Sequence, residues 1–577
     1  MSEDEDTTIL LNNASRSTEP PAIKPPLKEY EYIPPKKLRK PIPRHTENLT
    51  PLTTENQNVL VSIVAALAGV SFGYDMGISR QIAPLVKGEF GLDCNEENMI
   101  VNVWFVGCLL GAVFGGIKID TCGRRWTMIS SLVFLTFGSM LSALANHYIL
   151  FLVARIICGY SGTVSAMAHC IYMAEVSTFS KRGCNITLHQ LGAAAGLLFA
   201  VIAVANKSPD YQWRFAIGVT AVPALITCII TIIFLQRSPS FMLLKRVANV
   251  PRVPVKNSWC YVFETLVVMM IMLALRQGTG RQQVLYYAPR LFALLGICSN
   301  IAKVTSMIAL GVVRVFSTIL CLIVAERCGR RTALITSATI CMTSVSLLSL
   351  LATLDRGDEL LNFPNEPCSL VTTNTMGNEF LNKMKSISPT GSPPPFPLLP
   401  TPLAITAPNT ETWTQVKASC ETQNIITTDG LTGGLKILAV ITLLVFESAY
   451  ALGLGPVPLL TLSEVFPAAI RGKCVGFSVI VLWLVHILLS ESIGRMTRAM
   501  TLAGTYLFYS FMCLIAILYI FLIYPETKGK SLNRIAQELR KIPLATRICN
   551  NMRSLPTICH IEWIIKFGEK ANQSTPI

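Results

Sequence analysis

Long apolar segments recur along this chain of 577 residues, and short polar stretches separate most of them. A helix of about 20 residues spans the ~30 Å hydrocarbon core of a bilayer, so we expect each segment to be a membrane-spanning helix. The pattern predicts an all-α polytopic membrane protein of twelve such helices, with the seventh interrupted by Gly278 and Gly280. Their predicted ranges are 58–79, 97–117, 127–146, 149–172, 186–205, 214–235, 260–292, 301–324, 332–354, 435–459, 474–492 and 501–523.

Composition favours lipid as the solvent of this protein. Only 14% of the residues are charged and the mean hydropathy is +0.50, whereas about 25% of a typical soluble protein is charged. The net charge is +15, and the basic residues concentrate in the two tails and after the even-numbered segments. Because Lys and Arg are enriched in cytosolic loops, we expect both termini in the cytosol and no nucleic-acid partner.

Two pairs of motifs indicate an internal repeat. The segment 120–125 recurs with small changes at 326–331, and the segment 175–183 recurs at 464–472. The second pair is further apart, and a polar, proline-rich insertion at about 355–434 accounts for the difference. Such repeats predict two six-helix bundles around a site near the membrane midplane. The predicted parts are a disordered cytosolic tail (1–57), a first bundle (58–239), a short cytosolic linker (240–258), a second bundle that includes the insertion as an extracellular loop (259–524), and a cytosolic tail (525–577).

The motifs between residues 58 and 532 resemble those of the sugar porter branch of the major facilitator superfamily. The long loop after the ninth helix and the segment 170–175 are most similar to the third class of the facilitated glucose transporters. The resemblance implies a secondary transporter of glucose-like hexoses that works by alternating access, as a uniporter or with protons. The motifs that carry it are Gly116-x-x-x-Asp120-x-x-Gly-Arg-Arg125, Glu326-Arg-x-Gly-Arg-Arg331, Gly455-Pro-x-Pro458, Ser463-Glu-Val-Phe-Pro467 and Pro525-Glu-Thr-Lys-Gly529.

Charged residues at the helix ends are candidates for a cytosolic gate. The two Gly-Arg-Arg turns place guanidinium groups where Glu175, Glu326 and Glu464 can accept bidentate hydrogen bonds. We predict that these pairs stabilise the outward-facing state and separate when the transporter opens inward. Ordinary anchoring of basic residues at the cytosolic face is the alternative. The predicted gate consists of Asp120, Arg124, Arg125, Glu175, Arg182, Glu326, Arg330, Arg331, Glu464 and Arg471.

Polar residues inside the apolar segments are candidates for substrate binding, because polar groups in lipid are expensive and usually face a cavity. Amides supply the donors and acceptors that sugar hydroxyls require, and an aromatic ring can pack against the sugar ring. The family resemblance assigns the sugar-binding role to Gln190. Hydrogen bonding between helices is the alternative at each position. The predicted substrate-binding residues are Gln190, Gln277, Gln282, Gln283, Tyr286, Tyr287, Arg314 and Trp483, with His486 one turn after Trp483.

Several positions depart from the family pattern. Arg276 stands where relatives carry the first glutamine of the seventh helix, Arg281 follows Gly280, and Leu459 replaces a tryptophan. Arg314 stands where many relatives carry a sugar-binding asparagine, although the third class tends to have a basic residue there. These departures leave the identity of the substrate open and keep a non-transporting sugar sensor as an alternative function.

Asp75 and Arg155 lie inside the first and fourth segments and match an ion pair of proton-coupled relatives. Burial opposes the charge of such a carboxylate while the guanidinium stabilises it, so protonation can be tied to opening of the pair. Weak proton coupling and a static structural ion pair both fit this pattern.

The remaining features concern location and modification. Leu10 and Leu11 follow acidic residues and fit either a sorting signal for an adaptor protein or a solvated tail, and the resemblance implies the plasma membrane or endosomal vesicles. Asn206 begins a glycosylation sequon, and Cys368 and Cys420 lie in the loop where a disulfide can form. The sequence contains no paired metal-ligand spacing, phosphate loop or nucleophile elbow, so we expect no metal, no cofactor and no enzyme activity.

Overall fold

The computed structural model describes residues 55–178, 181–205, 212–236, 258–293, 299–327, 329–354 and 433–553, together with positions 238, 242 and 295. The chain divides into two units, Met1–Gln57 and Asn58–Ile577, and the arrangement below is that of the second. Several predicted features lie outside the described residues: Leu10, Leu11, Asn206, Cys368, Cys420, most of the linker, most of the loop at 355–434 and the last residues of the tail.

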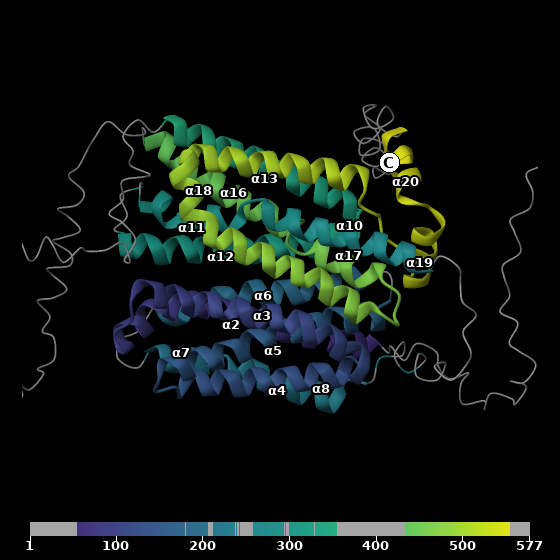
Figure 1. Ribbon diagram of the computed structural model, residues 1–577, viewed down its shortest axis with the longest axis horizontal. Coiled ribbons are helices and arrows are strands. Elements are labelled where there is room, and N and C mark those ends of the chain that lie inside the picture. The colour runs from purple at the N-terminus through teal and green to yellow at the C-terminus, as the bar shows by residue number, and fades with distance from the viewer. Residues whose placement is uncertain are drawn as a thin grey trace, which may run out of the picture. The chain divides into compact units, whose positions relative to one another are not determined.

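Every regular element in the described part of the chain is an α-helix, as Figure 1 shows. The first group comprises α2 (Glu55–Phe90), α3 (Cys94–Cys122), α4 (Arg124–Ala143), α5 (Tyr148–Val176), α6 (Arg182–Ala205), α7 (Gln212–Gly218) and α8 (Ala221–Phe234). The second comprises α10 (Ser258–Gly278), α11 (Arg281–Ala293), α12 (Ser299–Arg327), α13 (Arg330–Leu354), α16 (Gly433–Leu452), α17 (Val457–Val465) and α18 (Arg471–Leu522). Two short helices that the sequence pattern did not predict follow, α19 (Leu532–Lys541) and α20 (Leu544–Arg553).

The two groups form separate bundles that lie side by side in Figure 1. In the first bundle α5 packs between α3 and α4, and α8 packs on α4. In the second bundle α13 packs on α16 and α18, and α11 packs on α12. The bundles meet along two seams, α3 with α18 and α6 with α12. A site between the bundles is therefore bounded by these four helices.

Three glycines bring the backbones of α3 and α18 close together in their seam. A Cβ atom added at Gly116 of α3 would lie 2.7 Å from the carbonyl oxygen of Gly472 and 3.1 Å from the Cα atom of Gly476 in α18. Small residues let helix backbones approach closely in a membrane. The two bundles are therefore in backbone contact at the end of the protein that carries residues 120–125, which we call the motif end.

The predicted interruption of the seventh helix is confirmed. The helix α10 ends at Gly278, and α11 begins at Arg281. Gly280 between them has φ +77°, a conformation that costs little only for glycine. The backbone breaks where the glutamines of this segment lie.

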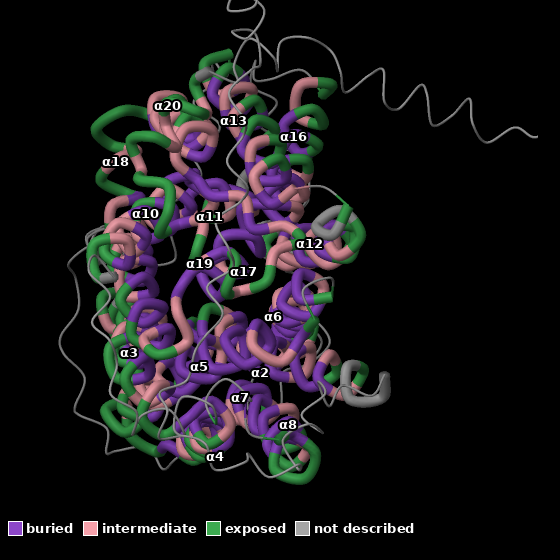
Figure 2. The backbone as a smooth tube through the Cα atoms, turned by 90° about the vertical axis from the view of Figure 1, so that its right-hand side faces the viewer, coloured by how far each residue is buried: buried purple, intermediate pink, exposed green. Residues whose placement is uncertain are grey.

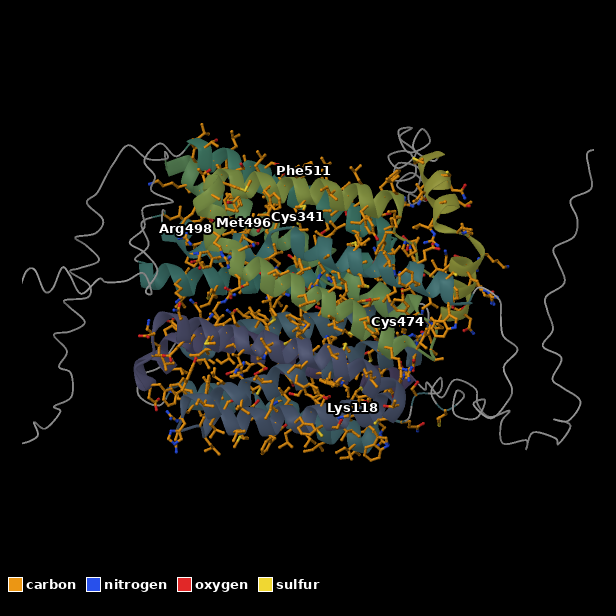
Figure 3. All side chains as sticks on the ribbon, in the orientation of Figure 1. Lys118, Cys341, Cys474, Met496, Arg498 and Phe511 are labelled. Atoms are coloured by element: carbon orange, nitrogen blue, oxygen red, sulfur yellow. The ribbon has the colours of Figure 1, made fainter. Side chains whose placement is uncertain are left out.

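The helix α18 contains two spans rather than one. Its 52 residues would extend ~78 Å as a straight helix, far beyond the ~30 Å core of a bilayer. Thr501 has non-helical angles (φ 63°, ψ 170°) and divides it. In Figure 3 the first part runs from Cys474, toward the right of the view, to Arg498 at the left, and the second part returns through Phe511. The predicted ranges 474–492 and 501–523 are these two parts.

The exterior of the bundles is apolar. Among the described residues, eleven helical segments are long and apolar enough to cross a membrane, and the division of α18 raises the number of spans to twelve. Figure 2 shows that buried residues lie mainly on the inner sides of the helices and exposed residues mainly on the outside. Large apolar side chains such as Phe114, Phe137 and Ile233 lie on that outer side, each more than half exposed. The protein is an integral, multi-pass membrane protein.

Candidate functional site

A cavity of about 140 Å³ lies between the two bundles, and we call it the first cavity. Its wall comes from α2, α5 and α6 of the first bundle and from α10, α11, α12, α16, α17 and α18 of the second. A dry protein cavity of about 150 Å³ holds a benzene ring. The first cavity therefore has room for one six-membered ring, with residues of both bundles around it.

Five of the predicted substrate-binding residues line this cavity. They are Gln190 of α6, Gln277 of α10, Gln282 of α11, Arg314 of α12 and Trp483 of α18. The Gln277 amide lies 3.4 Å from Nδ1 of His486, and the Gln282 amide also contacts the His486 ring. The wall thus combines amides with an aromatic surface.

Several buried polar atoms in this wall have no hydrogen-bond partner among the described residues. They are both ring nitrogens of His189, Nε1 of Trp483 and Oε1 of Gln282. His189 is 1% exposed and Trp483 is 6% exposed. A buried polar group without a partner costs ~1–3 kcal/mol. A ligand that offers hydroxyl groups would recover this free energy, because a hydroxyl both donates and accepts.

Three other predicted binding residues do not line the cavity. The Gln283 amide donates to the carbonyl oxygen of Leu489 at 3.3 Å, and the Tyr287 hydroxyl lies 2.7 Å from the Thr497 hydroxyl. Tyr286 is partly exposed, at 37%. The break at Gly280 changes the direction in which α11 presents its side chains, and Gln282 rather than Gln283 faces the cavity.

A second cavity of about 130 Å³ adjoins the first on the side away from the motif end. The two share Gln282, His486 and Arg314 in their walls. Its other lining residues include Gln81 and Met307, which are in contact across the bundles at 2.9 Å. Nearer the surface, Asn102 donates to Glu491 at 2.5 Å. The bundles therefore touch on both sides of the cavities.

A buried carboxylate organises the arginines in the second bundle. Glu447 of α16 accepts hydrogen bonds from Arg281 at 2.6 and 3.0 Å, and Arg314 lies 3.9 Å from the same carboxylate. The Arg281 guanidinium also lies 5.0 Å from the centre of the Tyr450 ring. Arg276 donates to the carbonyl oxygen of Leu454 at 2.8 Å. Arg276 and Arg281, which depart from the family pattern, are thus each bound to a specific partner.

The motif end is closed by carboxylates that arginines of both bundles share. Glu175 of α5 accepts from Arg124 of its own bundle at 3.0 Å and from Arg471 of the other bundle at 2.8 Å. Ser238 donates to its second oxygen. Removing one partner from a buried ion pair typically costs ~3–5 kcal/mol. This shared carboxylate therefore ties the bundles together at the motif end.

The repeat produces a corresponding pair in the second half. Glu464 of α17 lies 3.6 Å from Arg182 of the first bundle. The Arg330 guanidinium approaches the same region, since a Cβ added at Gly183 would lie 3.1 Å from its Nη2. Glu175 and Glu464, like Arg182 and Arg471, are 289 positions apart. Each carboxylate thus meets the arginine that the opposite bundle supplies.

The remaining predicted gate residues differ in their contacts. Asp120 accepts from the backbone amides of Gly472 and Lys473, at 3.0 and 2.9 Å, where α18 begins. Arg125 donates to the carbonyl oxygen of Ile232 and Arg331 to Asn551. The second arginine of each turn therefore binds neutral groups, because consecutive helical residues point ~100° apart. The side chain of Glu326 lies outside the described part of the structure.

Comparison with known proteins decides the family. The sequence model of the family described as "Sugar (and other) transporter" matches residues 61–251, 248–359 and 418–539, which is more than half of the chain. The chain belongs to the sugar (and other) transporter family. The predicted resemblance to the sugar porters is confirmed.

Individual members of the sugar transporter family support the same assignment. The mouse facilitated glucose transporter member 12 of solute carrier family 2 is 28% identical, over 85% of this chain and 86% of that relative. The mouse member 10 is 29% identical, over 84% of this chain and 94% of that relative. Among solved structures, the proton:xylose symporter XylE bound to 6-bromo-6-deoxy-D-glucose has a TM-score of 0.62 at 20% identity, and the match covers 84% of this chain and all of that one. The likeness to XylE establishes the fold.

In this sugar transporter the predicted ion pair lies outside the two cavities. Arg155 of α5 donates to Asp75 of α2 at 2.8 Å, and both side chains are fully buried. Trp104 of α3 donates to the second Asp75 oxygen at 2.6 Å. The Trp104 ring then contacts Trp483 edge to face, with centroids 5.8 Å apart. Trp104 therefore connects the ion pair to the wall of the first cavity.

Sequence reasoning missed several polar site residues of this transporter family member, among them His189 of α6 in the wall of the first cavity. Glu447 is an acid within an apolar segment, and such residues are functional candidates by default, so its position alone was a signal. Arg80 of α2 lines the second cavity. It lies near the end of the first predicted span, where an arginine is ordinarily attributed to the membrane surface.

Proposed function

We propose that this protein is a secondary transporter that moves hexoses across a membrane by exposing the first cavity to the two sides in turn. The observation that carries the proposal is the group of buried, unpartnered polar atoms on His189, Trp483 and Gln282, which sugar hydroxyls can satisfy. The names of two relatives, both facilitated glucose transporters, support hexoses as the substrate class.

In the proposed cycle the motif end closes and opens as one unit. Its closed form is held by Glu175, which lies between Arg124 and Arg471, and by Asp120 of α3, which accepts from the Gly472 amide at the start of α18. These contacts link helices of different bundles, so they have to separate when the bundles rock apart at this end. Binding of substrate at the opposite end and release at the motif end then alternate.

The proposed orientation puts the motif end and both termini in the cytosol, with the second cavity facing outward. The support is the concentration of basic residues in the tails and after even-numbered spans. The bundle limits at 58–239 and 259–524, a plasma-membrane or endosomal location, and recognition of Leu10 and Leu11 by a sorting adaptor belong to the same proposal.

We also propose that transport of the sugar is coupled to protons through Asp75. Asp75 is fully buried and bonded to Arg155 and Trp104, so a proton on this carboxylate would weaken both contacts. The Trp104–Trp483 contact offers a route by which that change reaches the sugar. The name of one solved relative, a proton:xylose symporter, is consistent with such coupling.

The test is uptake of radiolabelled D-glucose, D-galactose and D-fructose into proteoliposomes that contain the full chain. We expect saturable uptake of at least one hexose, with the KM for it raised about tenfold in Gln282→Leu, since loss of a buried hydrogen bond costs ~1–2 kcal/mol. The neighbouring variant Gln283→Leu, outside the cavity wall, is the matched control and should change KM less than about twofold. Binding of hexose without flux would overturn the proposal and favour a sugar sensor.

A further inference from the structure

The walls of the two cavities carry an excess of positive charge. Four arginines line them, namely Arg80, Arg276, Arg281 and Arg314, and Glu447 is the acidic residue among the lining residues. A charged side chain within a membrane is costly and is ordinarily paired with an opposite charge. Arg80 is exposed, whereas the other three are buried or half-buried. One carboxylate cannot compensate these three guanidinium groups, so the cavities are suited to an anion.

The arginines differ in how far the protein satisfies them. Arg281 is bound to Glu447 through two hydrogen bonds, and Arg276 donates to the Leu454 carbonyl oxygen. Arg314, by contrast, has Glu447 at 3.9 Å and donates no hydrogen bond to any residue that the structure describes. Arg80 likewise donates none within the described ranges. Arg80 and Arg314 both line the second cavity, and their donors are available there.

These two arginines belong to different bundles. Arg80 is on α2 of the first bundle and Arg314 is on α12 of the second. A guanidinium presents paired N–H groups that match a carboxylate better than a neutral hydroxyl. A carboxylate in the second cavity would therefore face a guanidinium group from each bundle.

We infer that the preferred substrate is a monosaccharide that carries a carboxylate, of the hexuronate class. The inference rests on the proposed function, since it places the sugar ring in the first cavity beside Trp483 and Gln282. The carboxylate then lies in the second cavity between Arg80 and Arg314. Because Gln282 and Arg314 line both cavities, one ligand can occupy the two together.

The experiment compares uptake of labelled D-glucuronate and D-glucose by the full chain in proteoliposomes. We expect glucuronate to be transported and to compete with glucose. In Arg314→Gln and in Arg80→Gln, the ratio of glucuronate uptake to glucose uptake should fall about tenfold, the scale of one lost charge-assisted hydrogen bond. The control Arg498→Gln, an exposed arginine at the end of the first α18 span, should leave the ratio unchanged.

Each of the other possible results would overturn either this inference or the proposed function. Glucose transport without glucuronate transport or competition would overturn this inference and leave the hexose function intact. Equal losses of both sugars in Arg314→Gln would also overturn it. Competition by acetate or chloride as strong as that by glucuronate would mean that the arginines bind a simple anion, which again overturns it. Failure of both sugars to enter would refute the proposed function itself.

Discussion

Glu447 accepts two hydrogen bonds from Arg281, from Nη2 at 2.6 Å and from Nε at 3.0 Å, although the residues lie 166 positions apart. The contact joins α16 to α11 immediately after the break at Gly280. It holds the segment that carries Gln282 in place, and it gives the second bundle its own buried ion pair, as Asp75 and Arg155 do in the first.

Loss of this carboxylate should destabilise the protein. We expect Glu447→Gln to lower the free energy of unfolding by about 3 kcal/mol, because it leaves Arg281 buried without its counter-charge. The midpoint of thermal unfolding in detergent would report it. The control is Glu538→Gln, which removes a partly exposed surface partner of Lys530 and Arg534 and should cost less than about 1 kcal/mol. Equal midpoints for the two variants would contradict the role of Glu447.

Weakening the shared carboxylate at the motif end should expose the first cavity from that end. Cys170 lines this cavity and is a natural probe. In Glu175→Gln we expect maleimide to modify Cys170 about tenfold faster, measured by peptide mass spectrometry. Cys549 is exposed in the tail, so its rate is the internal control. A Cys170 rate that stays at the wild-type value would exclude Glu175 as part of the closure.

A methyl group in the α3–α18 seam should hinder closure directly. Gly116→Ala would place a Cβ atom 2.7 Å from the Gly472 carbonyl oxygen, so the helices have to separate. We expect D-glucose uptake to fall about tenfold, a loss that corresponds to ~1.4 kcal/mol. Gly494 of α18 has no atom within 4 Å of an added Cβ, and Gly494→Ala should transport normally. Similar uptake by both variants would speak against backbone contact in the closed state.

Proton coupling predicts the direction in which uptake changes with external pH. If the proton travels on Asp75, wild-type uptake should rise as external pH falls, and uptake by Asp75→Asn should not depend on external pH. The control Glu491→Gln alters an acid at the surface end of the seam and should keep the wild-type profile. An Asp75→Asn profile that follows the wild type would leave the Asp75–Arg155 contact as a purely structural pair.

The helical spans and the motif end could be predicted because their signals are local or repeated. Runs of apolar residues located the spans, and the repeat indicated that Glu175 and Glu464 are equivalent, as are Arg182 and Arg471. Two apolar runs, at 474–492 and 501–523, also predicted the two spans that α18 contains.

The interior of the site could be predicted only in part. Helical periodicity cannot be carried across the break at Gly280, so the sequence did not separate Gln282, which faces the cavity, from Gln283, which faces α18. The partner of Glu447 was not visible either, because the contact joins helices far apart in the chain. Arg276 and Arg281 were recognised as unusual, but their partners depend on tertiary packing.

The bond between Asp120 and the first amides of α18 is made to main chain. Substitution of the side chain at position 473 therefore leaves both hydrogen bonds to Asp120 intact, so this position can vary during evolution. An insertion or deletion of one residue just before Gly472 would instead turn both amides by about 100° around the helix axis. The length of the turn that leads into α18 is thus under stricter constraint than its composition.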